Sequence, residues 1–382
     1  MKKKQTKTGP KSVTGFSILK IYLQEKRQKE DWILNRKRRN RAGFFLGILL
    51  LLFGSMPAAA ARQESEPNQL FATAACLMDG DTGRVLFGKR ETDPMAMAST
   101  TKIMTCILAL ENGGEQAVAT ASAQAAAAPK VHLGVYEGEQ FLLGDLLYSL
   151  MLESHNDAAV MIAETISGSI EGFAALMNEK AAVIGCTDTH FVTPNGLDAS
   201  DAGGDHHTTA ADLARIMRCC IKNETFLSIT REPSWTFTDM DGNRSFTVQN
   251  KNAFLQMMEG ALTGKTGFTN EAGYCYVGAL ERGEKRLITV VLACGWPNHK
   301  TWKWMDTKAL MNYGLEDYHK ETVGSDRMAL EPVSVMDGQK EKVEILTDAA
   351  LEDFLLKEDD EFTMEVLVPD ILKAPVQAGE LV

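Results

Sequence analysis

The sequence predicts a mixed α/β (α+β) body followed by a small β-rich domain. Strand patterns stand at both ends of the body, and helical patterns fill the stretch between them. Such an order indicates one sheet that is built from both ends of the domain and covered by helices. From about Leu330 the pattern changes to short strands and turns, which is typical of a separate β module.

The body begins with a hairpin, because a polar turn containing Gly80 and Gly83 separates two apolar runs. A helix follows from Ser99 and ends before Gly113, a residue type that favours helix C-termini. In chain order the predicted elements are strands 74–78 and 84–87; helices 99–111, 142–151, 157–166, 170–184 and 209–221; strands 274–280 and 286–294; helix 302–313; and tail strands 333–336, 343–346 and 362–368.

Residues 1–61 form a basic leader with an apolar segment. They hold 14 Lys and Arg against 3 Asp and Glu, which gives a net charge of +11. Since the whole chain has a formal net charge of −11, the remaining residues carry −22. The basic run 36–39, the apolar run 44–53 and the alanines 58–61 correspond to the three parts of a secretory signal peptide. We expect cleavage near Ala61, with an uncleaved membrane anchor as the alternative. Either way the acidic body is exported.

Composition excludes several classes of function. An acidic body argues against nucleic acid as a partner, because phosphate binding needs a basic surface. The seven cysteines are odd in number and include no Cys-x-x-Cys pair, which predicts neither a zinc site nor a full disulfide framework. The adjacent His206 and His207 are better explained as structural than as metal ligands. We therefore expect no metal and no cofactor.

A first chemical motif is Ser99-Thr100-Thr101-Lys102 at the start of a predicted helix. Residues three apart on a helix share a face, so the Lys102 amine should lie beside the Ser99 hydroxyl. A serine hydroxyl becomes a good nucleophile only when a base takes its proton, and lysine can do so when burial or a nearby cation lowers its pKa. Taken alone, a Ser-x-x-Lys pattern is common by chance.

A second motif is Ser154-His155-Asn156, between two predicted helices. The Ser154 hydroxyl can relay a proton, and the Asn156 amide can hold a peptide carbonyl. The competing interpretation is that Asn156 simply caps the following helix, a position for which asparagine is well suited. For this motif in isolation, the cap would be favoured.

The third motif is Lys265-Thr266-Gly267, on a predicted strand edge. Gly264 and Gly267 allow a ligand to approach the backbone, while Lys265 and Thr266 supply a cation and a hydroxyl suited to a carboxylate. A phosphate-binding loop is excluded because the position five residues before Gly264 is not a glycine.

The three motifs occur in a fixed order, 55 and then 111 residues apart. Together they resemble the penicillin-binding and serine β-lactamase superfamily, and in particular the serine-type D-alanyl-D-alanine carboxypeptidases of low molecular mass. The resemblance covers about residues 69–315 and includes the stretches 98–105, 156–159, 191–197 and 265–274. It implies an antiparallel sheet flanked by helices, with a helical subdomain.

The resemblance also implies a mechanism. Ser99 is the acyl-ester nucleophile, Lys102 accepts its proton, and Ser154 relays a proton to the leaving D-alanine. The remaining motif residues bind substrate. The oxyanion hole consists of two backbone N–H groups, those of Ser99 and Phe268. These substrate-binding residues are Asn156, Lys265, Thr266, Gly267 and, as the second backbone oxyanion donor, Phe268. The expected partners are peptidoglycan pentapeptide stems and, as inhibitors, β-lactam antibiotics. Lys300 or Lys303 is a weaker candidate for carboxylate binding.

The chain departs from the family in two places. His155 occupies the middle of Ser-x-Asn, where the family has a small residue. The family's second, all-β domain is often followed by an amphipathic anchor helix, whereas here we expect an incomplete β domain without an anchor. The predicted domains are therefore the leader 1–61, a catalytic domain 62–318 and a β-rich domain 319–382.

The expected function is that of a carboxypeptidase that remodels the cell wall outside the cytoplasmic membrane. Three rival functions fit the sequence less well. A class A β-lactamase needs a Glu-x-x-Leu-Asn sequence, and the nearest match, at Glu224, has Ser228 in place of the asparagine. A transpeptidase normally carries a long domain ahead of its serine. A penicillin sensor or inactive wall-binding scaffold is disfavoured by the intact catalytic residues. The sequence leaves open whether the role is vegetative or in sporulation, and which third stem residue is preferred.

Overall fold

The structure is a computed structural model that describes residues 19–23, 67, 69–325, 329–346, 350–358, 360, 362–366 and 368–377. Contacts divide the chain into two compact units. One comprises Ser65–Glu321 with Asp353–Leu356, and the other comprises Met1–Glu64, Thr322–Glu352 and Lys357–Val382. The predicted signal segment between Arg41 and Ala61 lies outside the described residues.

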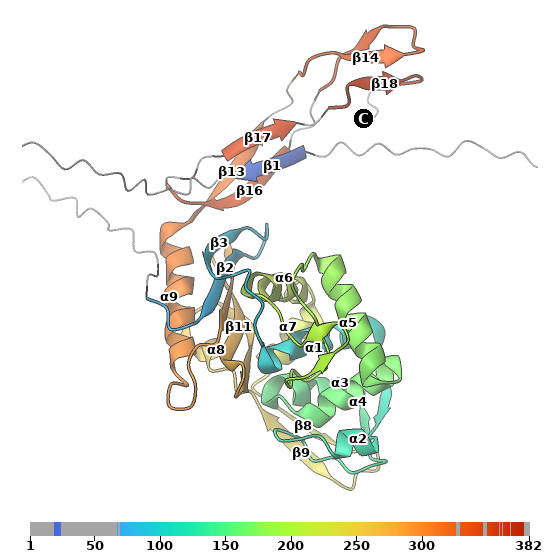
Figure 1. Cartoon of the computed structure of the whole chain (residues 1–382), viewed down its shortest axis with the longest axis vertical. Coiled ribbons are helices and arrows are strands. Elements are labelled where there is room, and N and C mark those ends of the chain that lie inside the picture. Colours follow the sequence, from blue (N-terminus) through green and yellow to red (C-terminus); the bar gives the residue numbers. More distant parts are fainter. Residues whose placement is uncertain are drawn as a thin grey trace, which may run out of the picture. The chain divides into compact units, whose positions relative to one another are not determined.

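A five-stranded antiparallel sheet forms the centre of the larger unit (Figure 1). Its strand order joins the two ends of the domain, as the sequence predicted, since strands from the C-terminal part pair with the N-terminal hairpin. In spatial order the strands are β10 (Ala261–Thr269), β11 (Gly273–Arg282), β12 (Lys285–Leu292), β2 (Ala74–Asp79) and β3 (Val85–Lys89). Strand β10 is therefore an edge strand.

Helices cover both faces of this sheet (Figure 1). Strand β2 is buried along its whole length, and its alternate residues enter two different cores. Cys76 and Met78 face the helical region, whereas Leu77 faces α9 (Trp302–Asp317), which contributes Leu310. The continuous apolar run of β2 is thus explained by burial on both faces.

The helical region between β3 and β10 carries most of the remaining elements. Several of its helices start at a polar side chain that accepts a backbone hydrogen bond, as at Ser122, Ser169, Thr209 and Asn223. The helices are η1 (Ala98–Thr101), α1 (Lys102–Asn112), α2 (Ala123–Ala126), α3 (Leu143–Tyr148), η2 (Ser149–Glu153), α4 (Asn156–Ser167), α5 (Ile170–Ile184), α6 (Ala210–Cys220), α7 (Glu224–Arg231) and α8 (Phe254–Met257). Short strand pairs are β4 (Val118–Thr120) with β5 (Gln140–Leu142), β6 (Ser200–Asp201) with β7 (Gly204–Asp205), and β8 (Ser234–Thr238) with β9 (Ser245–Gln249).

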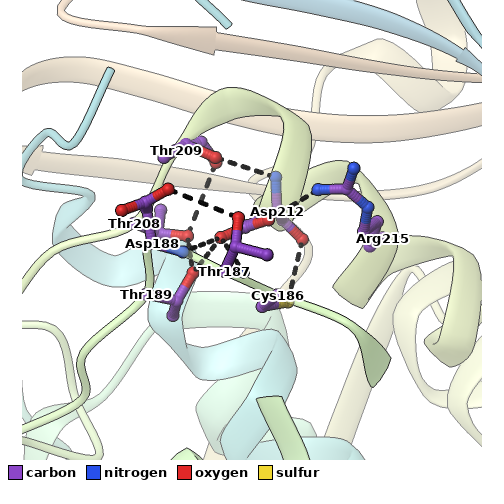
Figure 2. A network of polar contacts seen from close by, with 8 residues as sticks. All are labelled: Cys186, Thr187, Asp188, Thr189, Thr208, Thr209, Asp212 and Arg215. Atoms are coloured by element: carbon purple, nitrogen blue, oxygen red, sulfur yellow. Dashed lines mark hydrogen bonds and ion pairs between the residues drawn. The ribbon is translucent and has the colours of Figure 1, made fainter. Parts of the chain in front are cut away.

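Asp212, in the first turn of α6, anchors the long segment between α5 and α6 (Figure 2). Its carboxylate accepts hydrogen bonds from the backbone N–H groups of Thr187 and Asp188 and from the hydroxyl of Thr189, and it forms an ion pair with Arg215. The side chain is 1% exposed, so this buried charge is compensated on several sides. The start of the segment is thereby held to the helix that ends it.

The C-terminal part contains short strands, as expected. They are β13 (His319–Ser325), which pairs with β16 (Ala350–Leu356); β14 (Val333–Met336), which pairs with β15 (Lys342–Val343) and β18 (Ile371–Lys373); and β17 (Phe362–Val366), which pairs with β1 (Leu19–Leu23). The predicted strand 343–346 is wrong in extent, because β15 ends at Val343 and Leu346 forms only an isolated bridge with Ala329.

Three local predictions need correction. The helix expected from Ser99 begins with a 3-10 turn, and regular α-helix starts only at Lys102. The helix expected over 142–151 is two elements, because α3 passes into a π-helical turn that ends at Glu153. The hairpin β8–β9 was missed, although its strands alternate polar and apolar residues on either side of Asp241-Gly242. In the described part of the chain, no single helix is long and apolar enough to cross a membrane, although the sharply bent pair α4 and α5 passes on length and composition.

Candidate active site

Ser99 lies in the 3-10 turn η1, at the entry to α1. Its side chain is half-buried, whereas Thr100, Thr101 and Lys102 around it are buried. The tight turn places the Lys102 Nζ 2.9 Å from the Ser99 Oγ, in line with the predicted three-residue spacing. A hydroxyl that reaches solvent is thus paired with an amine that does not.

Lys102 is held by two further acceptors. Its Nζ donates to the Asn156 Oδ1 at 2.8 Å and to the Asn195 carbonyl at 2.7 Å. The Asn156 Nδ2 in turn donates to the carbonyl of Pro129, which fixes the amide so that its oxygen faces the lysine. A neutral amine has two N–H groups and one lone pair. With both N–H groups directed at these acceptors, the lone pair faces the Ser99 hydroxyl.

Burial determines the protonation behaviour of this lysine. Complete burial lowers the pKa of Lys102 well below its usual value, the Lys265 ammonium lowers it further, and Asp157 acts in the opposite direction. Burial thus favours the neutral amine, which is the form that can act as a base.

Ser154 and Asn156 flank the junction between η2 and α4. Ser154 ends the π-helical turn with a left-handed backbone (φ 70°), and its side chain is half-buried. Asn156 is the first residue of α4, whose N-cap is His155. The cap interpretation of Asn156 is therefore wrong, because its amide contacts Lys102 and Pro129 instead.

His155 is buried on the side of η2. Its Nδ1 lies 2.8 Å from the Ser149 Oγ and its Nε2 lies 3.6 Å from the Glu153 carboxylate. Burial lowers the pKa of His155, while Asp157 and Glu153 raise it. The unusual side chain is thus accommodated by Ser149 and Glu153.

Lys265 extends from β10 toward Ser154. Its Nζ donates to the Ser154 Oγ at 2.8 Å and to the Thr266 carbonyl at 2.9 Å, which leaves a third N–H without one of these partners. The side chain is 3% exposed, and burial lowers the pKa of Lys265 to about 7. The site therefore contains two hydroxyl–amine pairs, Ser99 with Lys102 and Ser154 with Lys265.

Gly267 brings β10 against the nucleophile's turn. A Cβ at this position would lie 2.9 Å from the Ser99 nitrogen, 3.0 Å from the Ala98 Cβ and 3.0 Å from the Met97 carbonyl oxygen. Such distances are too short for a side chain, so only glycine allows the strand this close.

The strand register shows where the Phe268 N–H points. Phe268 is opposite Tyr274 of β11, but the N–H of Tyr274 donates to Gly295 and its carbonyl accepts from Cys294. In an antiparallel sheet both backbone groups of a residue face the same neighbour, so the Phe268–Tyr274 pair is not hydrogen-bonded. The Phe268 N–H therefore points out of the open edge of β10, on the edge that adjoins Ser99.

Two contributors were missed as site residues. Asn195 accepts from Lys102 and, at 3.3 Å, from the Ser99 hydroxyl. Asp157 accepts backbone hydrogen bonds from Leu133, Gly134 and Val135, which holds the loop beside Asn156. Both lie in stretches that resemble the family, and that resemblance was the only sequence signal for them.

His206 supports the turn from behind. Its Nδ1 accepts from the backbone of Val192 and Thr193, so the Nε2, 2.8 Å from the Thr101 Oγ1, carries the proton. Thr101 in turn donates to the Ala98 carbonyl. Burial and nearby positive charges lower the pKa of His206 to about 3, which keeps it neutral. The predicted structural role agrees with this geometry.

Among the described His, Cys, Asp and Glu residues, no three form a group that could hold a metal ion. Lys303, the weaker candidate for carboxylate binding, is 7% exposed, with its Nζ 4.6 Å from the centre of the Tyr274 ring and donating to the Lys300 carbonyl.

The fold and the site define a serine acyl-transfer enzyme of the penicillin-binding class. The chain matches the D-alanyl-D-alanine carboxypeptidase family over residues 60–295. It is 34% identical to the carboxypeptidase DacB2 of Mycobacterium tuberculosis, across 70% of this chain and 89% of that protein. It is 28% identical to DacF of Bacillus subtilis, across 90% and 88%.

Solved structures agree. A D-alanyl-D-alanine carboxypeptidase from Mycobacterium tuberculosis aligns with a TM-score of 0.59 and 33% identity, covering 65% of this chain and 92% of that chain. The Streptomyces K15 DD-transpeptidase aligns with a TM-score of 0.59 and 29% identity, covering 65% and 98%. The chain belongs to the D-alanyl-D-alanine carboxypeptidase family. It is a serine-type carboxypeptidase that cleaves the terminal D-Ala–D-Ala bond of peptidoglycan stem peptides.

Proposed function

We propose that Ser99 forms the acyl-enzyme and that Lys102 is its base. The observation that carries this proposal is the 2.9 Å contact between the Ser99 Oγ and a buried amine whose N–H groups are directed elsewhere. The lone pair of Lys102 takes the hydroxyl proton while Ser99 attacks the carbonyl of the penultimate D-alanine. Breakdown of the tetrahedral intermediate expels the terminal D-alanine, and water later hydrolyses the ester.

Ser154 and Lys265 serve the leaving group and the substrate's terminal carboxylate. The Ser154 hydroxyl, which accepts from Lys265, relays to the departing amine nitrogen the proton that Lys102 took from Ser99. The Lys265 ammonium and the Thr266 hydroxyl bind the carboxylate, and Asn156 holds the peptide backbone. The same carboxylate contacts would orient a β-lactam.

The backbone N–H groups of Ser99 and Phe268 form the oxyanion hole. Support comes from the edge position of β10 and from the close approach of Gly267 to the Ser99 nitrogen. A donor aimed at the developing oxyanion is worth ~3–4 kcal/mol of barrier. A fixed pair of donors also explains why the strand packs directly on the turn.

We further propose that the enzyme acts outside the cytoplasmic membrane in cell-wall remodelling, with residues 62–318 as the catalytic domain. The signal-like leader and the location of the stem peptides support export. Membrane association is assigned only to the leader, if it is not cleaved.

The β-lactamase alternative is not favoured by the position of Glu224. This residue starts α7 and interacts electrostatically with Arg286, whose cross-strand partner on β11 is Glu281. The site residue Thr266 has a different partner on β11, Tyr276. Glu281 and Tyr276 are five residues apart on this strand. Five residues along a strand correspond to about 16 Å, so Glu224 lies near the opposite end of the sheet from the site.

The test is release of D-alanine from diacetyl-Lys-D-Ala-D-Ala by the wild type, by Ser99→Ala and by Ser234→Ala, a control at an exposed serine of β8. We expect release by the wild type and the control, and none by Ser99→Ala. Penicillin labelling of Ser99 without release would instead support the sensor or scaffold. Release that survives Ser99→Ala would refute the assigned nucleophile.

A further inference from the structure

Three residues on one face of β10 face the site in order. Residues two apart on a strand share a face, and here the shared face is that of Lys265, Gly267 and Thr269. Lys265 contacts Ser154, Gly267 lies against Ser99, and the Thr269 Oγ1 donates to the Asp198 Oδ1 at 3.1 Å. The face of β10 that carries the site therefore continues to a third point, about four residues or 13 Å from Lys265.

This order fixes the direction in which the substrate runs, given the proposed function on which the inference rests. The terminal carboxylate lies at Lys265, and the scissile carbonyl lies between Ser99 and the Phe268 N–H. The part of the stem peptide that stays on the enzyme must then extend past Phe268 toward Thr269. The stem residue that precedes the acyl D-alanine consequently lies next to Asp198.

Asp198 is suited to a cation. It is exposed, and among the described residues no Lys, Arg or His forms an ion pair with it. Its place is well defined, because it follows Asn195 by three residues and the Asn195 carbonyl is held by Lys102. Three residues span at most about 10 Å, so the carboxylate stays close to the nucleophile.

The aromatic side chains of the hairpin are not part of this subsite, because Phe268 and Tyr274 lie on the opposite face of the strands from Thr269. Phe268 is 38% exposed and lies on Tyr274, with ring centres 4.6 Å apart. Trp296 is 43% exposed, and its indole N–H donates to the carbonyl of Asn270 at the tip of the β10–β11 hairpin.

We propose that Asp198, positioned by Thr269, binds the side-chain ammonium of the stem residue that precedes the acyl D-alanine. The subsite takes a diamino acid with a free amine, either lysine or diaminopimelate. The pair is largely exposed, so it contributes a modest preference and not an absolute requirement. Asp198 is thus a specificity-determining residue for the third stem position.

The test compares kcat/KM for Nα-acetyl-Lys-D-Ala-D-Ala, which has a free amine, with that for the diacetylated peptide. We expect the wild type to prefer the free amine by about three- to tenfold at low salt, mainly through KM, and Asp198→Asn to reduce this ratio to about one. High salt should weaken the preference. Glu271→Gln, a change at an exposed acid of the hairpin tip, is the matched control and should keep the wild-type ratio.

Several outcomes would overturn the inference. One such outcome is a wild-type kcat/KM that is equal for the two peptides. Another is an equal fall in kcat/KM for both peptides in Asp198→Asn with an unchanged melting temperature. Either would show that Asp198 only holds Thr269 in place. Failure of the wild type to hydrolyse either peptide would refute the proposed function instead. A matched peptide with meso-diaminopimelate, tested with and without amine acetylation, identifies which diamino acid is preferred, and loss of rate on acetylation supports the subsite in either case.

Discussion

At the scale of single residues, the site depends on two lysines that the fold removes from water. An ammonium is costly to bury, so burial favours the neutral amine. Lys102 and Lys265 both experience this effect. The consequence differs because Lys102 meets a nucleophile, whereas Lys265 retains a free N–H toward the place assigned to the substrate carboxylate.

The pKa of about 7 for Lys265 predicts an alkaline decline in activity. In the free enzyme the ammonium is lost as pH rises through this value, and with it the attraction for the carboxylate. We expect kcat/KM to fall above about pH 7 through a rising KM, because kcat/KM reports the free enzyme. Lys265→Arg keeps its charge at these pH values, so its decline should move to higher pH. An unchanged profile in Lys265→Arg would contradict the assignment.

His206 predicts an acid-sensitive stability. Its pKa is about 3 in the folded chain and near 6.5 when unfolded. Between these values the unfolded chain binds a proton that the folded chain does not, so the free energy of unfolding falls as pH drops from about 6.5 toward 3, by up to ~1.4 kcal/mol per pH unit. In His206→Asn this contribution should vanish. Urea unfolding at pH 7 and pH 4.5 measures this contribution. An equal loss of the free energy of unfolding between the two pH values in the wild type and in His206→Asn would refute it.

At the scale of elements, the site is an intersection of irregular pieces. A 3-10 turn carries Ser99, a π-helical turn ends at Ser154 in a left-handed conformation, and an edge strand carries Lys265. None of these is a regular helix interior. Departures from regular geometry place side chains and N–H groups in the cleft that an unbroken helix or a central strand would direct elsewhere.

The contact between β10 and η1 predicts the effect of a single methyl group. In Gly267→Ala the new Cβ meets the Ser99 nitrogen at 2.9 Å, so the strand must move away from the turn. We expect kcat/KM and the rate of penicillin acylation to fall about 100- to 1,000-fold, as for loss of an oxyanion donor. Stopped-flow acylation measures this, with circular dichroism to verify the fold. Retention of wild-type acylation would show that the strand does not contribute to the oxyanion hole.

At the scale of the whole molecule, the catalytic unit is a sheet between two cores, and its second core takes in a segment from far along the chain. Leu355 is 3% exposed and packs with residues of β2 and α9, and its carbonyl accepts from Arg84. Residues Asp353–Leu356 thus belong to the unit that carries the site. Besides the proposed catalytic domain 62–318, the catalytic unit therefore includes this short distant segment.

Leu355→Ala should therefore destabilise the catalytic unit although it lies about 90 residues beyond Lys265. Removal of a buried leucine typically costs about 2–5 kcal/mol, which includes the cavity that remains. Leu346→Ala, at a leucine that is 58% exposed, is the control and should change stability by less than about 0.5 kcal/mol. Thermal melts followed with bound fluorescent penicillin measure both, and equal stabilities would contradict the assignment of this segment.

The sequence predicted the Ser99–Lys102 contact and the family, because the first depends on a local spacing and the second on the order of three motifs. The Ser99–Lys102 spacing is a property of one helical turn, and three motifs in one order carry a joint signal that no single motif has. The strands and most helices followed from periodicity. The π-helical turn did not, since its residues have no distinctive pattern, whereas the β8–β9 hairpin was missed although its strands alternate polar and apolar residues around Asp241-Gly242.

By itself, the sequence determined the family, the Ser99–Lys102 pair and the sheet built from both ends of the domain, whereas the pairing of Ser154 with Lys265 appeared only in the structure. Only the tertiary structure decided what surrounds those groups. Asn195 supplies the acceptor that orients Lys102, His206 supports the turn from 105 residues away, and Asp198 meets Thr269 across the cleft. Such contacts join positions distant in the chain, and their effect on pKa and direction depends on burial, which residue order alone does not specify.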